Sequence, residues 1–224
     1  MKYDNLNKFK DSFSNYTELR VQENRNNRVN LTNGDVTGNV ATKHSGVSAR
    51  VFKDGNWGFS SSPEINKESI EQVVNASTSN VQFMNKKDSS KCGFFLPETQ
   101  ANYNMDLTTK KDRQNQKYWL EFVKELDGYI EKKYPELLSR NLIIGGLDME
   151  KSLFTSDGSE SYSMTPRALL YAMLSIEKDG SPFSLGTPWG GLGQLEDKFL
   201  DPSNYFLEID VLVERLKEKA NGIH

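Results

Sequence analysis

The chain has 224 residues, of which 36% are hydrophobic and 26% are charged, and its 12 Phe, 9 Tyr and 3 Trp can fill a globular core. Its net charge of −3 at pH 7 argues against a nucleic-acid-binding protein, because neutralising many phosphates requires an excess of basic residues. No run approaches the roughly 18 consecutive apolar residues of a membrane span, and the first residues hold no apolar signal region. We therefore expect a cytoplasmic protein without a membrane segment, and the single Cys92 fits a reducing compartment.

The first sixty residues alternate between apolar and polar side chains, which is typical of half-buried strands. Asn33-Gly34 and Asp54-Gly55 are residue pairs that tolerate positive φ, so each predicts a tight hairpin turn. The pattern indicates an antiparallel meander. The expected strands are 17–23, 28–32, 36–42, 46–52 and 56–60.

A first helix of about three turns is expected after Ser62-Pro63-Glu64, with Ile70, Val73 and Val74 on its buried side. Residues 85–116 are polar and show no sustained period. They predict an irregular linker between two sub-halves, at approximately 1–84 and 117–224.

The second sub-half begins with the clearest helix, because Trp119, Phe122, Leu126 and Ile130 recur at helical spacing and Pro135 follows. Four further strands are expected at 142–147, 151–156, 160–164 and 168–177, and a last helix at about 205–220. The order of strands and helices predicts an α+β fold with mostly antiparallel sheets in two β-rich halves and packed helices.

Residues that could catalyse a reaction are scarce. Only two histidines occur, His44 and His224, so no helical pair of zinc-binding histidines exists and neither Cys92 nor a serine has an evident base. The sequence Ser156-Asp-Gly-Ser159 is interpreted as a hairpin turn, since it lacks the flanking pattern of a nucleophile elbow. We name no catalytic, metal-binding or cofactor-binding residue in this chain.

Two pairs of acids offer an alternative, a carboxylate site for acid and base catalysis. Glu121 and Glu125 lie one helical turn apart, but they fall opposite an apolar stripe and are interpreted as surface charges. Asp148 and Glu150 are interpreted as acids at the end of a strand.

Two other motifs are also given a structural interpretation. The basic run from Lys110 to Lys117 is expected to be a solvated face, and Gly190-Gly-Leu-Gly193 a tightly turned loop, because it matches no phosphate-binding motif.

One block resembles a known family. Residues 17–22 and 29–34, followed by Gly46-Val-Ser-Ala-Arg-Val-Phe-Lys-Asp-Gly-Asn-Trp-Gly-Phe-Ser60, are similar to the start of TldD/PmbA proteins, which open with strands, an Asn-Gly turn and a G-V-x-x-R-V-x-x-x-G-x-W-G-F-x-S block. Within this block, Trp57 is expected in the core and Arg50 beside an acid.

The resemblance implies that 1–224 is the N-terminal domain of a TldD-like zinc metallopeptidase acting on small or unfolded peptides. The family's zinc motif, H-E-x-x-x-H, belongs to a C-terminal domain, so zinc is expected there and no cofactor here. We expect this domain to be inactive alone, to help form a chamber for an extended peptide, and to pair with itself or with another family member. The alternatives are an interaction module with no peptidase partner, and a small enzyme that uses Asp, Glu or Ser.

Overall fold

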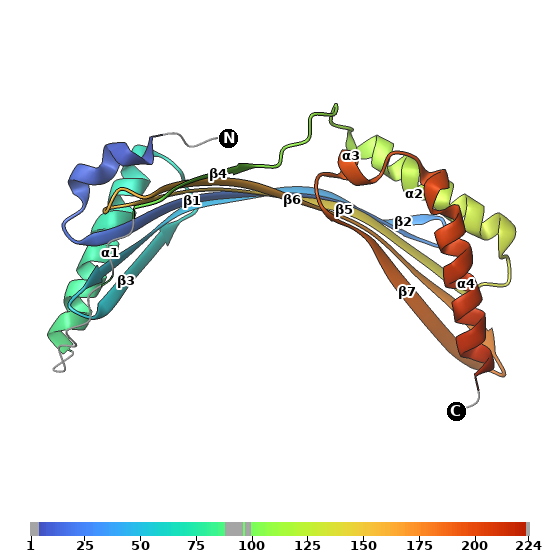
Figure 1. The fold of residues 1–224 in the computed structure, drawn as a ribbon. Coiled ribbons are helices and arrows are strands. Elements are labelled where there is room, and N and C mark those ends of the chain that lie inside the picture. The colour runs from blue at the N-terminus through green and yellow to red at the C-terminus, as the bar shows by residue number, and fades with distance from the viewer. Residues whose placement is uncertain (1–4, 88–95, 97–99, 223–224) are drawn as a thin grey trace. The chain divides into compact units, whose positions relative to one another are not determined.

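The structure, a computed structural model, describes residues 5–87, 96 and 100–222 (Figure 1). Its strands follow the order β3-β2-β1-β5-β6-β4, and β7 also pairs with β6. The strands are β1 (Tyr16–Thr32), β2 (Asp35–Lys53), β3 (Asn56–Ser62), β4 (Asn102–Asp106), β5 (Ser139–Thr155), β6 (Glu160–Lys178) and β7 (Ser181–Leu192). The helices are η1 (Leu6–Ser12), α1 (Lys67–Lys87), α2 (Gln116–Lys133), α3 (Leu195–Lys198), η2 (Pro202–Tyr205) and α4 (Phe206–Asn221). The predicted α+β class is confirmed, and β4 beside β6 is a parallel pair.

Four of the strands are much longer than expected. β1, β2, β5 and β6 have 17 to 19 residues each, whereas the sequence predicted two shorter strands in place of each one. That prediction was wrong because polar stretches such as 24–27 looked like breaks. An extended backbone keeps its hydrogen bonds to neighbouring strands whatever its side chains are, so polar residues inside a long ladder do not end it.

β7 and part of β6 were not predicted as strands, because they contain proline and glycine residues. β7 contains Pro182 and Pro188 and ends with glycines, so Gly190 and Gly191 lie in a strand and the predicted loop was wrong there. Pro166 falls between the stretch of β6 that pairs with β4 and the stretch that pairs with β7, so its missing amide hydrogen costs no ladder bond.

The remaining local predictions agree well with the structure. The hairpin turns at Asn33-Gly34 and Asp54-Gly55 have positive φ at both residues (51° and 85°, 48° and 87°), as that turn type requires. α2 and α4 lie where helices were expected, and α1 is longer than three turns at 21 residues. Within the expected linker 85–116, residues 102–106 form β4, while Cys92 lies outside the described residues.

The chain divides into two compact units. Unit 1 comprises 1–24, 43–107 and 149–165, and unit 2 comprises 25–42, 108–148 and 166–224. Each unit draws on three separate stretches, whereas the expected sub-halves were consecutive in sequence. In unit 1, α1 packs on β3 at Gly58, where any side chain would overlap the backbone of the helix.

Unit 2 holds the larger apolar core. α2 and α4 contribute the buried faces that the sequence predicted, including Trp119, Leu126 and Leu212, which share one apolar cluster with Leu142 and Leu174 of the sheet. Both helices lie over the sheet of this unit (Figure 1). None of the helices in the described part of the chain has the length and apolarity needed to cross a membrane.

A polar contact ties α2 to α4. The Asp210 carboxylate accepts hydrogen bonds from the Tyr129 hydroxyl at 2.8 Å, the Tyr134 hydroxyl at 2.7 Å and the Lys133 ammonium at 2.7 Å. Burial alone would raise the pKa of Asp210, but these donors outweigh it and lower that pKa. Burial, followed by the contact with Asp210, raises the pKa of Tyr134 to about 12.

Replacing Asp210 with Asn should therefore destabilise the protein in a pH-dependent way. A depressed pKa contributes stability above the unfolded value, near 3.9, and that contribution is lost as the pH falls through the folded value. We expect D210N to lower the free energy of unfolding by about 1 to 2 kcal/mol at pH 7 and by much less at pH 3. Urea denaturation at both values measures this, with the exposed Glu214→Gln on α4 as the control; an equal loss at both values would contradict the assignment.

Candidate functional site

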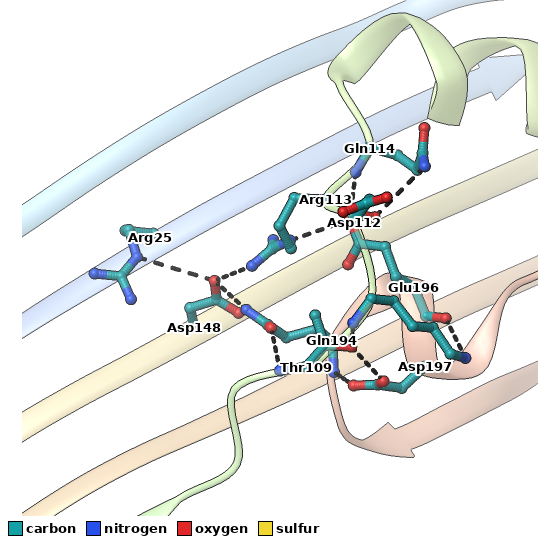
Figure 2. Close-up of polar contacts among 10 residues, drawn as sticks. Arg25, Thr109, Asp112, Arg113, Gln114, Asp148, Gln194, Glu196 and Asp197 are labelled. Atoms are coloured by element: carbon teal, nitrogen blue, oxygen red, sulfur yellow. Dashed lines mark hydrogen bonds and ion pairs between the residues drawn. The ribbon is translucent and has the colours of Figure 1, made fainter.

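Unit 2 contains a buried polar cluster, which we define as Asp148, Arg113, Gln194 and Glu196 (Figure 2). Asp148 comes from β5, Arg113 from the segment that leads into α2, and Gln194 and Glu196 from the turn that begins α3. Asp148, Gln194 and Glu196 are buried, whereas the Arg113 side chain is 42% exposed. Such a concentration of buried polar groups is the most unusual chemical feature of the unit.

Asp148 accepts two hydrogen bonds and forms a longer ion pair. Its Oδ2 accepts from the Arg113 guanidinium at 3.1 Å and from the Gln194 side-chain amide at 2.8 Å, and Arg25 of β1 lies 3.9 Å away. Burial would lower the pKa of Arg113, but its bonds to Asp148 and Glu196 raise it. These bonds therefore favour the charged form of the Arg113 guanidinium.

Glu196 is satisfied on one side only. Its Oε1 accepts from Arg113 Nε at 3.1 Å and from the backbone amide of Gln114 at 2.8 Å. Its Oε2 is buried and has no hydrogen-bond partner in the described part of the chain. A buried carboxylate oxygen without a hydrogen-bond partner costs free energy. The bond from Arg113 to the other oxygen of Glu196 is therefore needed to offset the cost of burying this carboxylate.

The same turn fastens the segment before α2 from a second side. The Asp197 carboxylate accepts from the Thr109 hydroxyl at 2.6 Å and from the backbone amide of Gln194 at 3.0 Å. Burial would raise the pKa of Asp197, but the Thr109 bond and other donors lower it. Lys111 donates from Nζ to the backbone oxygen of Glu196 at 2.8 Å. Lys111 and Arg113 are nevertheless both exposed, as the solvated-face interpretation predicted.

The cluster is suited to holding segments together, since each acid is already bound to a cation or an amide. No nucleophile stands beside a base within it. Among the residues that the structure describes, no three His, Cys, Asp or Glu side chains converge in a way that could hold a metal ion.

The acid pairs noted in the sequence do not form one site. Glu121 and Glu125 are exposed on α2, as the surface interpretation predicted, and Glu121 pairs with Lys124. Asp148 lies inside β5, not at a strand end, so that interpretation was wrong. Glu150, in unit 1, is also buried and accepts from the Tyr162 hydroxyl at 3.2 Å.

The other noted residues have structural roles or lie at the surface. Ser156 stands in the turn between β5 and β6, and its hydroxyl accepts the Thr17 amide at 3.0 Å, which confirms the hairpin interpretation. His44 is exposed on β2, and His224 lies outside the described residues.

The prediction that Trp57 lies in the core was wrong. Trp57 is 39% exposed, not a core residue, because it projects from the side of β3 opposite to Gly58, which contacts α1. Arg50 stacks on the Trp57 ring at 4.7 Å and donates to Glu18 at 2.8 Å, so the expected pairing of Arg50 with an acid is confirmed. Phe59, 56% exposed, extends this aromatic surface.

Gln194 and Glu196 were not singled out from the sequence, and Arg113 was noted only within the basic run interpreted as a solvated face. The sequence signal for the turn was a capping pattern, with Gln194 as the residue before α3 and Asp197 three positions later. Nothing in the sequence placed this turn beside Asp148, which lies 46 residues away.

Known proteins resemble this chain in part of its sequence and in its fold. Residues 17–81 match the family described as PmbA/TldA metallopeptidase domain 1. No curated protein matches the sequence.

Three solved structures share the fold. TldE from Thermococcus kodakarensis aligns over 97% of this chain and 46% of its own, with 12% identity and a TM-score of 0.69. A candidate modulator of a DNA gyrase from Thermotoga maritima aligns over 85% and 42%, with 19% identity and a TM-score of 0.65. Another such candidate, from Bacteroides thetaiotaomicron, aligns over 90% and 45%, with 16% identity and a TM-score of 0.64. The chain thus spans less than half the length of each.

Replacing Arg113 with Gln should destabilise unit 2, because Asp148 and Glu196 would then be buried without their shared cation. We expect the free energy of unfolding to fall by about 1 to 3 kcal/mol. Arg215→Gln, at an exposed arginine of α4, is the control and should change it by less than about 0.5 kcal/mol. Equal losses in urea denaturation would mean that the cluster contributes nothing specific.

Proposed function

We propose that this chain, which carries the first domain of a PmbA/TldD-type protein, is a noncatalytic part of a metallopeptidase system that degrades small or unfolded peptides in the cytoplasm. The observation that carries the proposal is the family match at residues 17–81, which includes β1, β2, β3 and most of α1. In this proposal the domain helps to enclose the peptide, and zinc is bound by residues of another domain.

An unpaired strand edge supports the peptide-holding role. Among the described residues, β3 pairs only with Val47–Lys53 of β2, so no strand covers the outer edge of 35–42, the part of β2 in unit 2. Val36 and Val40 are exposed there, at 45% and 49%. An extended peptide can add to such an edge through backbone hydrogen bonds, which tolerate varied sequences.

Two other strands offer poorer edges. Asn80 of α1 donates to the Phe59 backbone oxygen of β3 at 2.8 Å, and Lys219 of α4 donates to the Ser184 oxygen of β7 at 2.9 Å. In addition, β7 has no backbone N–H donor at Pro182 or Pro188. Residues 35–42 of β2 contain no proline and so keep all of their backbone amide hydrogens, although Gln116 of α2 donates to the Val40 backbone oxygen at 3.4 Å. We therefore take 35–42 of β2 as the better edge of unit 2.

Subunit pairing is the second part of the proposal. The exposed aromatic surface of unit 1, formed by Trp57 and Phe59 with Arg50 beside them, has the composition of a protein interface. A homodimer or a heterodimer with another family member would cover it. The alternative function, an interaction module without a peptidase partner, rests on the same surface.

Binding through backbone hydrogen bonds gives a direct test. An unfolded peptide titrated into the purified chain should bind saturably below about millimolar concentration, and N-methylation of alternate backbone nitrogens should weaken it at least tenfold. Fluorescence anisotropy of a labelled peptide measures both. If the two peptides bind equally, edge addition is wrong; if neither binds, the peptide-holding role is wrong.

A further inference from the structure

Unit 2 has a hollow of about 470 Å³ on its sheet, which we call the glycine hollow. Gly145 of β5 and Gly191 of β7 leave its floor without side chains, and Ile143, Leu147 and Leu169 supply apolar walls. Leu169 is 44% exposed.

The glycine hollow opens on the face of the sheet opposite to the helices. Ile143 alternates along β5 with Leu142 and Ile144, which are buried in the core that α2 and α4 complete. Successive side chains of a strand point to opposite faces, so Ile143 and Leu147 face away from that core. Tyr171 of β6 also lines the hollow, and its hydroxyl occupies the space that a side chain at Gly186 would need.

Two arginines without acidic partners line this apolar hollow. Arg28 of β1 and Arg167 of β6 are both exposed, and neither pairs with a carboxylate in the described part of the chain. The Arg28 guanidinium donates from Nε to the Asn30 side chain at 2.9 Å. Elsewhere in unit 2, by contrast, Arg113 and Arg140 are bound to buried acids.

The placement of these arginines allows both to reach one anion. β5 lies between β1 and β6, so Arg28 and Arg167 stand on either side of the Gly145 strand. Neighbouring strands are about 4.8 Å apart, which puts the two backbones roughly 10 Å apart. Two extended arginine side chains span that distance, and guanidinium groups bind carboxylates in a bidentate manner.

We infer that the glycine hollow binds the C-terminal end of a peptide whose last residue is apolar. The terminal carboxylate binds Arg28 and Arg167, which have no acidic partner in the described part of the chain. The last side chain packs on Ile143, Leu147 and Leu169. The bare backbone at Gly145 gives the peptide room to approach the sheet. This inference rests on the proposed peptide-holding function and names the part of the peptide that is recognised.

The experiment compares two N-acetylated peptides of six residues that end in Leu-Leu, one with a free carboxylate and one with a C-terminal amide. Calorimetric titration into the full chain should show the free acid binding at least tenfold more tightly. Arg28→Gln and Arg167→Gln should each weaken the free acid severalfold and, combined, abolish the difference between the peptides. Arg215→Gln removes an exposed arginine from α4 and should leave the difference intact.

The outcomes separate this inference from the function on which it rests. Equal binding of acid and amide would overturn recognition of the C-terminus and leave peptide holding intact. A difference that survives the double variant would overturn the assignment to Arg28 and Arg167. No saturable binding of either peptide up to about millimolar concentration would overturn both the inference and the proposed function.

Discussion

The fold depends on one constraint, the strict alternation of side chains along four strands of 17 to 19 residues. A slip of one residue would exchange the two faces of a strand. In unit 2, alternation places Leu142 and Ile144 beneath α2 and α4 and leaves Ile143 and Leu147 on the opposite face. The same rule in unit 1 turns Gly58 toward α1 and Trp57 toward solvent. The apolar core, the glycine hollow and the aromatic surface therefore all follow from the alternation of side chains between the two faces of a strand.

The buried polar cluster adds specificity to this framework. Burying Asp148 and Glu196 is costly, and the cost is acceptable only where Arg113 and Gln194 reach them together. An incorrect arrangement of the segment before α2 would leave both acids unmatched. We regard the cluster as a device that fixes this segment and the turn at α3, and not as a catalytic centre.

Local signals predicted the fold better than the candidate site. Asn33-Gly34 and the apolar stripe from Trp119 to Ile130 identify a turn and a helix because they act through neighbouring residues. The continuity of β1 and the strand at 181–192 were missed, since ladder pairing with distant segments overrides polar, proline and glycine residues. The cluster joins residues 113, 148 and 196, a convergence that no local pattern encodes. Trp57 was misplaced because the sequence did not reveal which face of β3 the helix covers.

The proposed function requires this domain to hold an extended peptide without cutting it. Hydrogen exchange of the chain with saturating peptide, followed by mass spectrometry of both components, tests it most directly. We expect added amide protection within 35–42 of β2, little change in β3, and a peptide of unaltered mass. Cleaved peptide, or protection confined to strands other than β2, would contradict it.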